Sequence, residues 1–220
     1  MSPHSERVLR DPDRAPARPG GLSRPSRPTP IPVKILVSGG FGVGKTTAIG
    51  ALSDIPPLTT EAAMTTAAAA VDDPGHQDRK TSTTVALDFG RVTIDTSIVL
   101  YMFGTPGQDR FGFMWNDLAE GALGGLVLVD TARLADCFVA IDYFERIGLP
   151  FVVAVNQFEG RHNLGVADVR AATDVDPHVP VVTVDARDRE SMKRLVLTLL
   201  EVLLRRARSG FTASSPVPAT

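Results

Sequence analysis

Short apolar runs alternate with longer amphipathic stretches from residue 33 onward. Six strands are expected, over residues 33–38, 85–89, 93–103, 126–129, 151–155 and 181–184. The last three runs are apolar without a two-residue period, which is typical of strands buried on both faces of a parallel sheet. The second and third, separated by Gly90-Arg91, are expected to form an antiparallel hairpin at the edge of the sheet.

The segments between the strands have the spacing of helices. They cover residues 44–52, 109–120, 134–147, 165–173 and 189–208. The last is the clearest, because Met192, Leu195 and Leu199 recur at the spacing of one helix face. Together the elements predict a three-layer α/β fold with a mostly parallel six-stranded sheet and one antiparallel edge strand.

The two ends and one internal segment lack a core pattern. Residues 1–32 contain eight prolines and six arginines and are expected to be a disordered arm, like the Ser- and Pro-containing tail at 209–220. The folded domain is therefore expected over residues 33–208. Residues 56–84 form an unusually long connection, in which Ala67–Ala70 can form a short helix.

Composition favours a cytoplasmic protein that does not bind nucleic acid. The net charge of −2 argues against a nucleic-acid coat, and the single cysteine, Cys137, fits core packing in a reducing compartment. We expect no membrane span, signal peptide or lipid anchor, so contact with a membrane would be indirect, through partners.

A glycine-rich motif between the first strand and first helix carries the chemistry. It reads Ser-Gly-Gly-Phe-Gly-Val-Gly-Lys-Thr-Thr and has the spacing of a phosphate-binding P-loop. Backbone N–H groups and the helix N-terminus suit phosphate, Lys45 neutralises its oxygens, and Thr46 offers a hydroxyl to Mg²⁺. The candidate nucleotide-binding residues here are Gly39, Gly40, Gly42, Val43, Gly44, Lys45, Thr46 and Thr47.

Two later segments resemble the switches of Ras-like GTPases. Residues 103–111, Phe-Gly-Thr-Pro-Gly-Gln-Asp-Arg-Phe, resemble switch II, which implies that Gly107 contacts the γ-phosphate and that Gln108 orients the attacking water. Residues 84–89, Thr-Val-Ala-Leu-Asp-Phe, are similar to a Rab-type switch I, which makes Thr84 a second Mg²⁺ ligand beside Thr46. Lys45 and Gln108 are thus the catalytic candidates.

The base-recognition elements resemble those of the same family. Asn156-Gln157-Phe158-Glu159 takes the place of Asn-Lys-x-Asp, with Glu159 as the acceptor for guanine and Gln157 in place of the lysine. Residues 185–187, Asp-Ala-Arg, resemble Ser-Ala-Lys, which implies that the Ala186 N–H meets guanine O6 between Asp185 and Arg187. GTP and GDP are therefore the expected nucleotides.

These pieces extend over residues 33–208 in Ras-like order. The sequences of these segments are most similar to those of the GTP-binding proteins of actinobacterial conservon operons, relatives of the bacterial polarity GTPase MglA. That resemblance implies a role as a slow GTPase switch in a bacterial signalling complex, with a roadblock/LC7-type regulatory protein and a sensor kinase as partners.

One position departs from the Ras-like pattern. Gly104 stands where these enzymes carry the aspartate that holds Mg²⁺ through water, so weak metal binding and slow turnover are expected. Arg79 and Lys80 can reach the γ-phosphate in cis, although solvated loop charge is the favoured interpretation. A nucleotide-binding scaffold with little hydrolysis remains an alternative, and a P-loop small-molecule kinase is a third.

Overall fold

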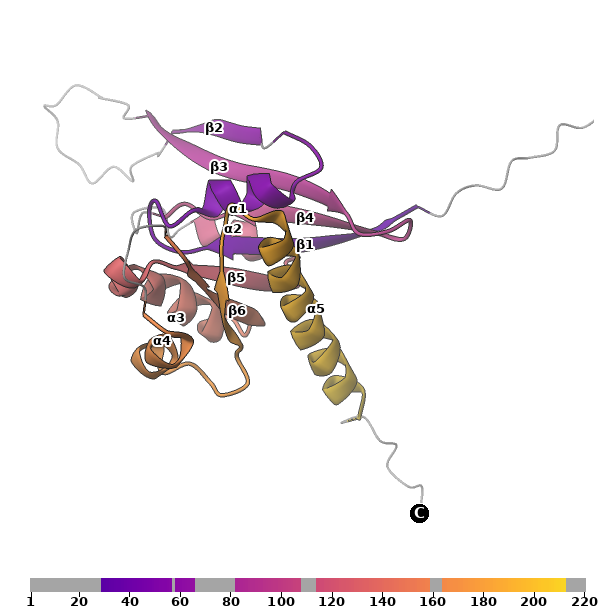
Figure 1. The fold of residues 1–220 in the computed structure, drawn as a ribbon. Coiled ribbons are helices and arrows are strands. Elements are labelled where there is room, and N and C mark those ends of the chain that lie inside the picture. Colours follow the sequence, from indigo (N-terminus) through magenta and orange to yellow (C-terminus); the bar gives the residue numbers. More distant parts are fainter. Residues whose placement is uncertain (1–28, 57, 66–81, 108–113, 159–163, 213–220) are drawn as a thin grey trace, which may run out of the picture.

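The computed structural model describes residues 29–56, 58–65, 82–107, 114–158 and 164–212, which form a sheet between two layers of helices (Figure 1). The strands are β1 (Ile31–Ser38), β2 (Leu58–Thr65), β3 (Ser82–Thr93), β4 (Ile98–Gly104), β5 (Gly124–Val129), β6 (Phe151–Asn156) and β7 (Val181–Val184). The helices are α1 (Lys45–Leu52), α2 (Trp115–Ala119), the 3₁₀ helix η2 (Thr131–Cys137), α3 (Phe138–Arg146), α4 (Val166–Thr173) and α5 (Arg189–Thr212).

The strands lie in the order β2-β3-β4-β1-β5-β6-β7. β1 pairs in parallel with both β4 and β5, and the parallel ladder continues through β6 to β7. β3 runs antiparallel to both of its neighbours, β2 and β4. The expected α/β class, with a mostly parallel sheet and one antiparallel strand, is confirmed.

The described sheet has a seventh strand, β2, where a structureless connection was expected. β2 pairs with β3 from Leu58↔Phe89 to Thr65↔Ser82, so the antiparallel strand is not the edge strand. The sequence Leu-Thr-Thr-Glu-Ala-Ala-Met-Thr has no clear apolar alternation, and main-chain hydrogen bonds, which any residue can make, add it to the sheet. Residues 67–70, where a short helix was expected, lie outside the described residues.

The hairpin turn lies between Thr93 and Ile98, not at Gly90-Arg91 as expected. The Asp95 carboxylate closes it by accepting hydrogen bonds from the N–H groups of Ser97 and Ile98, at 2.6 and 3.0 Å. Gly90 instead lies inside β3, where α1 passes so closely that a Cβ would be 2.6 Å from Ile49 Cγ2. The glycine thus serves helix packing and not the turn.

Several element boundaries also differ from the expected ones. α2 begins at Trp115, and residues 108–113 before it lie outside the description. The helix expected over 134–147 is divided between η2 and α3, which meet at Cys137 and Phe138. β1 starts two residues before residue 33, and α5 ends four residues after residue 208. Of the two ends that were expected to be disordered, residues 1–28 and 213–220 lie outside the described residues.

Two apolar clusters fill the spaces on either side of the sheet. Side chains alternate along each central strand, so Leu126 and Leu128 face α1 and α5 while Val127 and Val129 face α3. Cys137 belongs to the second cluster and is almost fully buried, as expected, and burial raises the pKa of its thiol to about 11. Burial on both faces explains the continuous apolar runs in the sequence.

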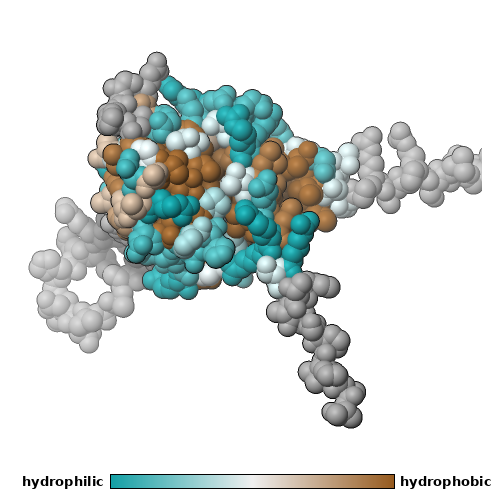
Figure 2. All heavy atoms as spheres, turned by 60° about the horizontal axis from the view of Figure 1, so that its bottom comes forward, coloured by the Kyte–Doolittle hydropathy of each residue, from teal (hydrophilic) through white to brown (hydrophobic). Residues whose placement is uncertain are grey.

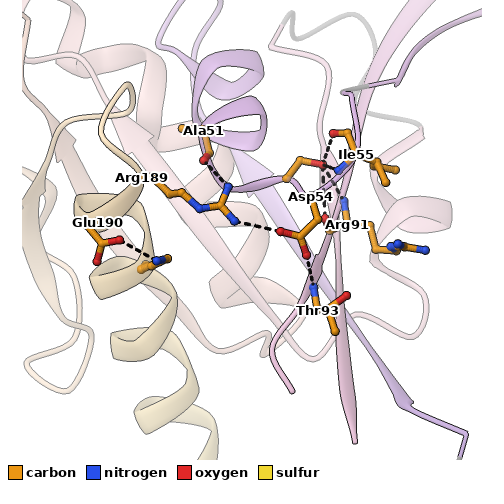
Figure 3. Close-up of polar contacts among 9 residues, drawn as sticks. Ala51, Asp54, Ile55, Arg91, Thr93, Arg189 and Glu190 are labelled. Atoms are coloured by element: carbon orange, nitrogen blue, oxygen red, sulfur yellow. Dashed lines mark hydrogen bonds and ion pairs between the residues drawn. The ribbon is translucent and has the colours of Figure 1, made fainter. Parts of the chain in front are cut away.

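A polar contact at the start of α5 joins three elements (Figure 3). Arg189 donates to the Ala51 carbonyl at the end of α1 and to Asp54 Oδ1, at 3.1 and 2.9 Å. Asp54 Oδ2 in turn accepts the Thr93 N–H of β3 at 2.7 Å. This backbone hydrogen bond, and then Arg189, lower the pKa of Asp54. The contact fixes α5 against the hairpin.

An apolar hollow lies at the end of the sheet where β1 and β6 begin. It has a volume of about 840 Å³ and is lined mainly by apolar side chains, among them Val33, Leu123, Leu149, Leu200 and Leu203. Figure 2, which brings the lower face of Figure 1 forward, shows brown apolar surface among teal polar side chains. None of the described helices is long and apolar enough to cross a membrane.

Substitution of Gly125 by alanine should destabilise the fold, since its Cβ would lie 2.4 Å from Cε2 of the buried Phe144. Overpacking of this kind costs about 1–3 kcal/mol, measured as the free energy of unfolding in urea. Phe144→Leu shortens the opposing side chain, so Gly125→Ala/Phe144→Leu should lose less than the sum of the single variants. Strict additivity would contradict this packing.

Candidate functional site

The glycine-rich segment 39–44 joins the end of β1 to the start of α1. It lies at the carboxyl ends of the parallel strands, and β1 is flanked by β4 on one side and β5 on the other. The connection after β1 leads toward β2 and β3, whereas that after β5 leads toward β6 and β7. Such a switch point opens a crevice in which α/β proteins bind ligands.

Glycine is required where the segment passes close to its surroundings. Gly39 has a φ of 132°, and a Cβ there would lie 2.3 Å from the Leu128 carbonyl oxygen of β5. Gly44 has a φ of 104°, and its Cβ would lie 2.9 Å from Asn156 Nδ2 of β6. Both positions are therefore closed to side chains for two independent reasons, backbone conformation and space.

Lys45, the first residue of α1, is only 9% exposed. Its ammonium group donates hydrogen bonds to the carbonyl oxygens of Gly39 and Gly40, both at 2.8 Å. Burial lowers the pKa of Lys45 to about 8, the negative charge of Asp88 opposes this, and the positive charge of Arg133 adds to it. The loop thus holds a cation that bonds to backbone oxygens and can turn to phosphate oxygens instead.

The next residue, Thr46, contacts a carboxylate that comes from β3. Thr46 Oγ1 donates to Asp88 Oδ2 at 2.6 Å. Asp88 is half-buried and also lies beside Gly104 at the end of β4, where a Cβ would be 3.0 Å from Asp88 Cβ. A hydroxyl and a carboxylate oxygen therefore converge beside the phosphate-binding loop, a donor set that suits Mg²⁺.

Gly107 packs directly onto the loop. A Cβ at this position would lie 2.6 Å from Lys45 Nζ and 2.9 Å from the backbone nitrogen of Phe41. Before it, the Thr105 N–H donates to the Val37 carbonyl, and the Thr105 hydroxyl donates to Ser38 Oγ at 2.9 Å. The end of β4 is thus fixed to β1, and Gly107 follows where this anchorage ends.

Asn156 connects the phosphate-binding loop to the loop after β7. Its Nδ2 donates to the Val43 carbonyl at 2.9 Å, and its Oδ1 accepts the Ala186 N–H at 3.0 Å. Asp185 accepts hydrogen bonds from the Arg187 backbone and guanidinium, and its pKa is lowered by the Arg187 side chain first. A hollow of about 170 Å³ lies here, lined by Gly42, Gly44, Thr47, Asn156, Gln157, Phe158, Asp185, Ala186 and Arg187.

The structure therefore brings most of the expected site residues to one edge of the sheet, from the P-loop, β4, β6 and the loop after β7. Thr84 lies in β3, paired with Ala63, and its side chain is outside the description. Gln108 and Glu159 lie outside the described residues, as do Arg79 and Lys80. The assigned roles of these residues remain predictions.

The structure adds two residues that the sequence analysis did not select, Asp88 and Arg133. Arg133 of η2 donates to the Phe41 carbonyl in the P-loop and lies 3.8 and 3.7 Å from the carboxylates of Asp130 and Asp136. No motif marks Arg133, because it reaches the loop from a connection 92 residues further along the chain. Asp88 was visible in the sequence only as part of the switch I resemblance.

One comparison with known proteins connects the chain to a nucleotide-binding family. A family model described as "Conserved hypothetical ATP binding protein" matches residues 37–208. The uncharacterized protein MJ1339 of Methanocaldococcus jannaschii is 34% identical over 101 residues, which cover 46% of this chain and 53% of that protein. The chain thus aligns with about half the length of this curated relative.

Solved structures share the fold at low sequence identity. The G domain of the T. maritima FeoB iron transporter has a TM-score of 0.55 at 16% identity, covering 78% of this chain and 99% of that domain. The FeoB G domain of Methanococcus jannaschii has a TM-score of 0.51 at 14% identity, covering 78% and 97%. At these identities the likeness concerns the P-loop GTPase-like fold alone.

The lowered pKa of Lys45 predicts how stability depends on pH. Between the folded-state pKa of about 8 and the ordinary lysine pKa of 10.5, the unfolded chain binds more protons, so the free energy of unfolding should rise with pH. Relative to Lys45→Met, which has no titrating group here, nucleotide-free wild type should gain roughly 1 kcal/mol per pH unit.

Urea denaturation at pH 7, 8, 9 and 10 measures this difference. Below pH 8 the free energies of unfolding of the two proteins should change with pH in parallel, because Lys45 is then charged in both the folded and unfolded states of the wild type. A constant difference across the whole range would mean that Lys45 keeps an ordinary pKa.

Proposed function

The chain belongs to the family described as "Conserved hypothetical ATP binding protein". We propose that it is a GTP-binding switch that hydrolyses GTP slowly. The observation that carries the proposal is the arrangement of the phosphate-binding loop. Lys45 and Thr46 lie in this loop, and Asn156 connects it to the loop after β7. These contacts support a proposal in which phosphate and base bind along one continuous edge of the sheet.

Phosphate binding follows from the geometry of the loop. The Lys45 ammonium is held by two backbone oxygens at 2.8 Å, and charge-assisted bonds to phosphate oxygens would be stronger. The start of α1 adds the partial positive charge of a helix N-terminus. Bound Mg²⁺ would neutralise phosphate charge, and Thr46 offers it a hydroxyl.

Guanine is favoured over adenine by the loop after β7. Ala186 is 2% exposed, and its N–H points to an acceptor, Asn156 Oδ1. A guanine O6 can share or replace this acceptor, whereas the adenine amino group, itself a donor, would face a second donor. Glu159 would accept the guanine N1 and N2 protons. The family description names ATP, so ATP is the competing nucleotide.

Switching follows from the place of Gly107. Gly107 lies close to Lys45, since a Cβ built on it would be 2.6 Å from Lys45 Nζ, so we expect a phosphate oxygen bound to Lys45 to contact the segment after Thr105. Binding of the γ-phosphate would then shift this segment, and its loss would let the segment return. In this proposal Gln108 positions the water for hydrolysis and Thr84 binds beside Thr46 on the metal.

One alternative function remains. A nucleotide-binding scaffold with little hydrolysis would use the same loop, and Gly104, which lacks the expected carboxylate, motivates it. The partners, a roadblock/LC7-type protein and a sensor kinase, and any indirect contact with a membrane are proposals that rest on the conservon and MglA resemblance alone.

Nucleotide binding and turnover test the proposal. Purified chain should bind GTP and GDP more tightly than ATP in the presence of Mg²⁺, followed by fluorescence of labelled nucleotides and a hydrolysis time course. Lys45→Ala should weaken binding by roughly 10- to 100-fold, because it removes a charge-assisted hydrogen bond. Gln108→Leu should retain binding and lose hydrolysis.

The matched control is Lys193→Ala, since this lysine lies at an exposed position of α5 and forms an ion pair with Glu190. It should change neither affinity nor turnover. Equal affinity for GTP and ATP would overturn the assignment of Ala186 and Glu159. Tight GTP binding without turnover would favour the scaffold.

A further inference from the structure

The position expected to carry the metal-binding carboxylate is Gly104, and another carboxylate fills its space. Asp88 of β3 lies next to Gly104 of β4, one residue beyond the register pair Phe89↔Phe103. A Cβ built on Gly104 would lie 3.0 Å from Asp88 Cβ and 3.3 Å from Asp88 Oδ2. An aspartate at position 104 would therefore have to enter the space that Asp88 occupies.

The Asp88 carboxylate points toward the phosphate-binding loop. Its Oδ2 accepts the Thr46 hydroxyl at 2.6 Å, and its charge is the main influence that raises the pKa of Lys45 against burial. Thr46 is the loop residue whose hydroxyl suits Mg²⁺. The carboxylate is thus beside both side chains that would contact the metal–phosphate group.

We propose that Asp88 supplies the carboxylate for Mg²⁺ that is missing at position 104, an inference that rests on the proposed nucleotide binding. The carboxylate has moved from the end of β4 to the neighbouring strand β3, and Gly104 leaves room for it. Mg²⁺ is commonly bound through one or two carboxylates together with phosphate oxygens and water, so a single relocated aspartate is sufficient. The weak metal binding expected from Gly104 alone then does not follow.

The position of the carboxylate on β3, and not on β4, would also link the metal to the β3–β4 hairpin. β3 continues from Asp88 to Thr93, whose N–H is held by Asp54 and, through it, by Arg189 of α5 (Figure 3). In the Ras-like arrangement the carboxylate belongs to the strand that leads into switch II. Here it belongs to the strand that follows the presumed switch I residue Thr84, so metal binding would tie the nucleotide to that strand.

Mg²⁺ titration of nucleotide binding tests the proposal without requiring turnover. Affinity for N-methylanthraniloyl-GTP is measured in EDTA and at increasing Mg²⁺. In wild type, Mg²⁺ should tighten binding; in Asp88→Asn, the half-saturating Mg²⁺ concentration should rise by about 10- to 100-fold, the range for a lost metal-site partner. Affinity in EDTA should not fall.

Asp142→Asn is the matched control, since it makes the same change at an exposed position of α3. It should titrate like wild type. Circular dichroism and urea denaturation confirm that each variant is folded. The relocation itself is tested by the exchange Asp88→Gly/Gly104→Asp, which returns the carboxylate to β4 and should restore the Mg²⁺ dependence to within a few-fold of wild type.

The outcomes separate this inference from the proposed function. If wild type and Asp88→Asn show the same Mg²⁺ dependence, Asp88 is only a hydrogen-bond partner of Thr46 and the inference is wrong, although nucleotide binding stands. If the exchange variant binds nucleotide in EDTA but stays insensitive to Mg²⁺, the relocation is wrong. If wild type binds no nucleotide, both proposals fall together.

Discussion

The site depends on one constraint, the buried ammonium group of Lys45. A cation that is 9% exposed must have partners, and the backbone carbonyls of Gly39 and Gly40 turn toward it at 2.8 Å. The loop can adopt this path only with glycine at positions such as 39 and 44. The proposed phosphate binding would use the same group, because a phosphate oxygen can replace a carbonyl oxygen on the same cation.

Three side chains from other elements form hydrogen bonds with the P-loop. Asn156 donates to the Val43 carbonyl and accepts the Ala186 N–H, so it connects the P-loop to the loop after β7. Asp88 reaches Thr46 from β3, and Arg133 reaches the Phe41 carbonyl from η2. A nucleotide that changed the loop would therefore be felt at β3, at η2 and at the loop after β7, which are far apart in the sequence.

The sequence pattern predicted the strands that are buried on both faces of the sheet. Residues 124–129 of β5 and 151–155 of β6 are buried and lack charged or polar side chains because both sheet faces are covered, and the glycine motif marks the start of α1. It missed β2, since an edge strand with Thr, Glu and Ala gains its place from backbone pairing. It also placed the hairpin turn at Gly90, whose small size serves the approach of Ile49.

The same reasoning found the P-loop but not its neighbours. Asp88 and Arg133 come to the loop through strand register and through the backbone break inside η2, neither of which a motif encodes. Gly104 was interpreted as the loss of a metal ligand because a motif compares residues only at equivalent sequence positions. It does not detect a carboxylate that comes from a neighbouring strand. The structure shows that the Asp88 side chain fills the space beside it.

A crystal structure with Mg²⁺ and a non-hydrolysable GTP analogue would test the central claim most directly. We expect Lys45 Nζ to leave the carbonyls of Gly39 and Gly40 for phosphate oxygens, Gly107 to move away from the Phe41 nitrogen, and Asp88 to lie beside the metal. A nucleotide bound elsewhere, with Lys45 still held by the two carbonyls, would contradict the account.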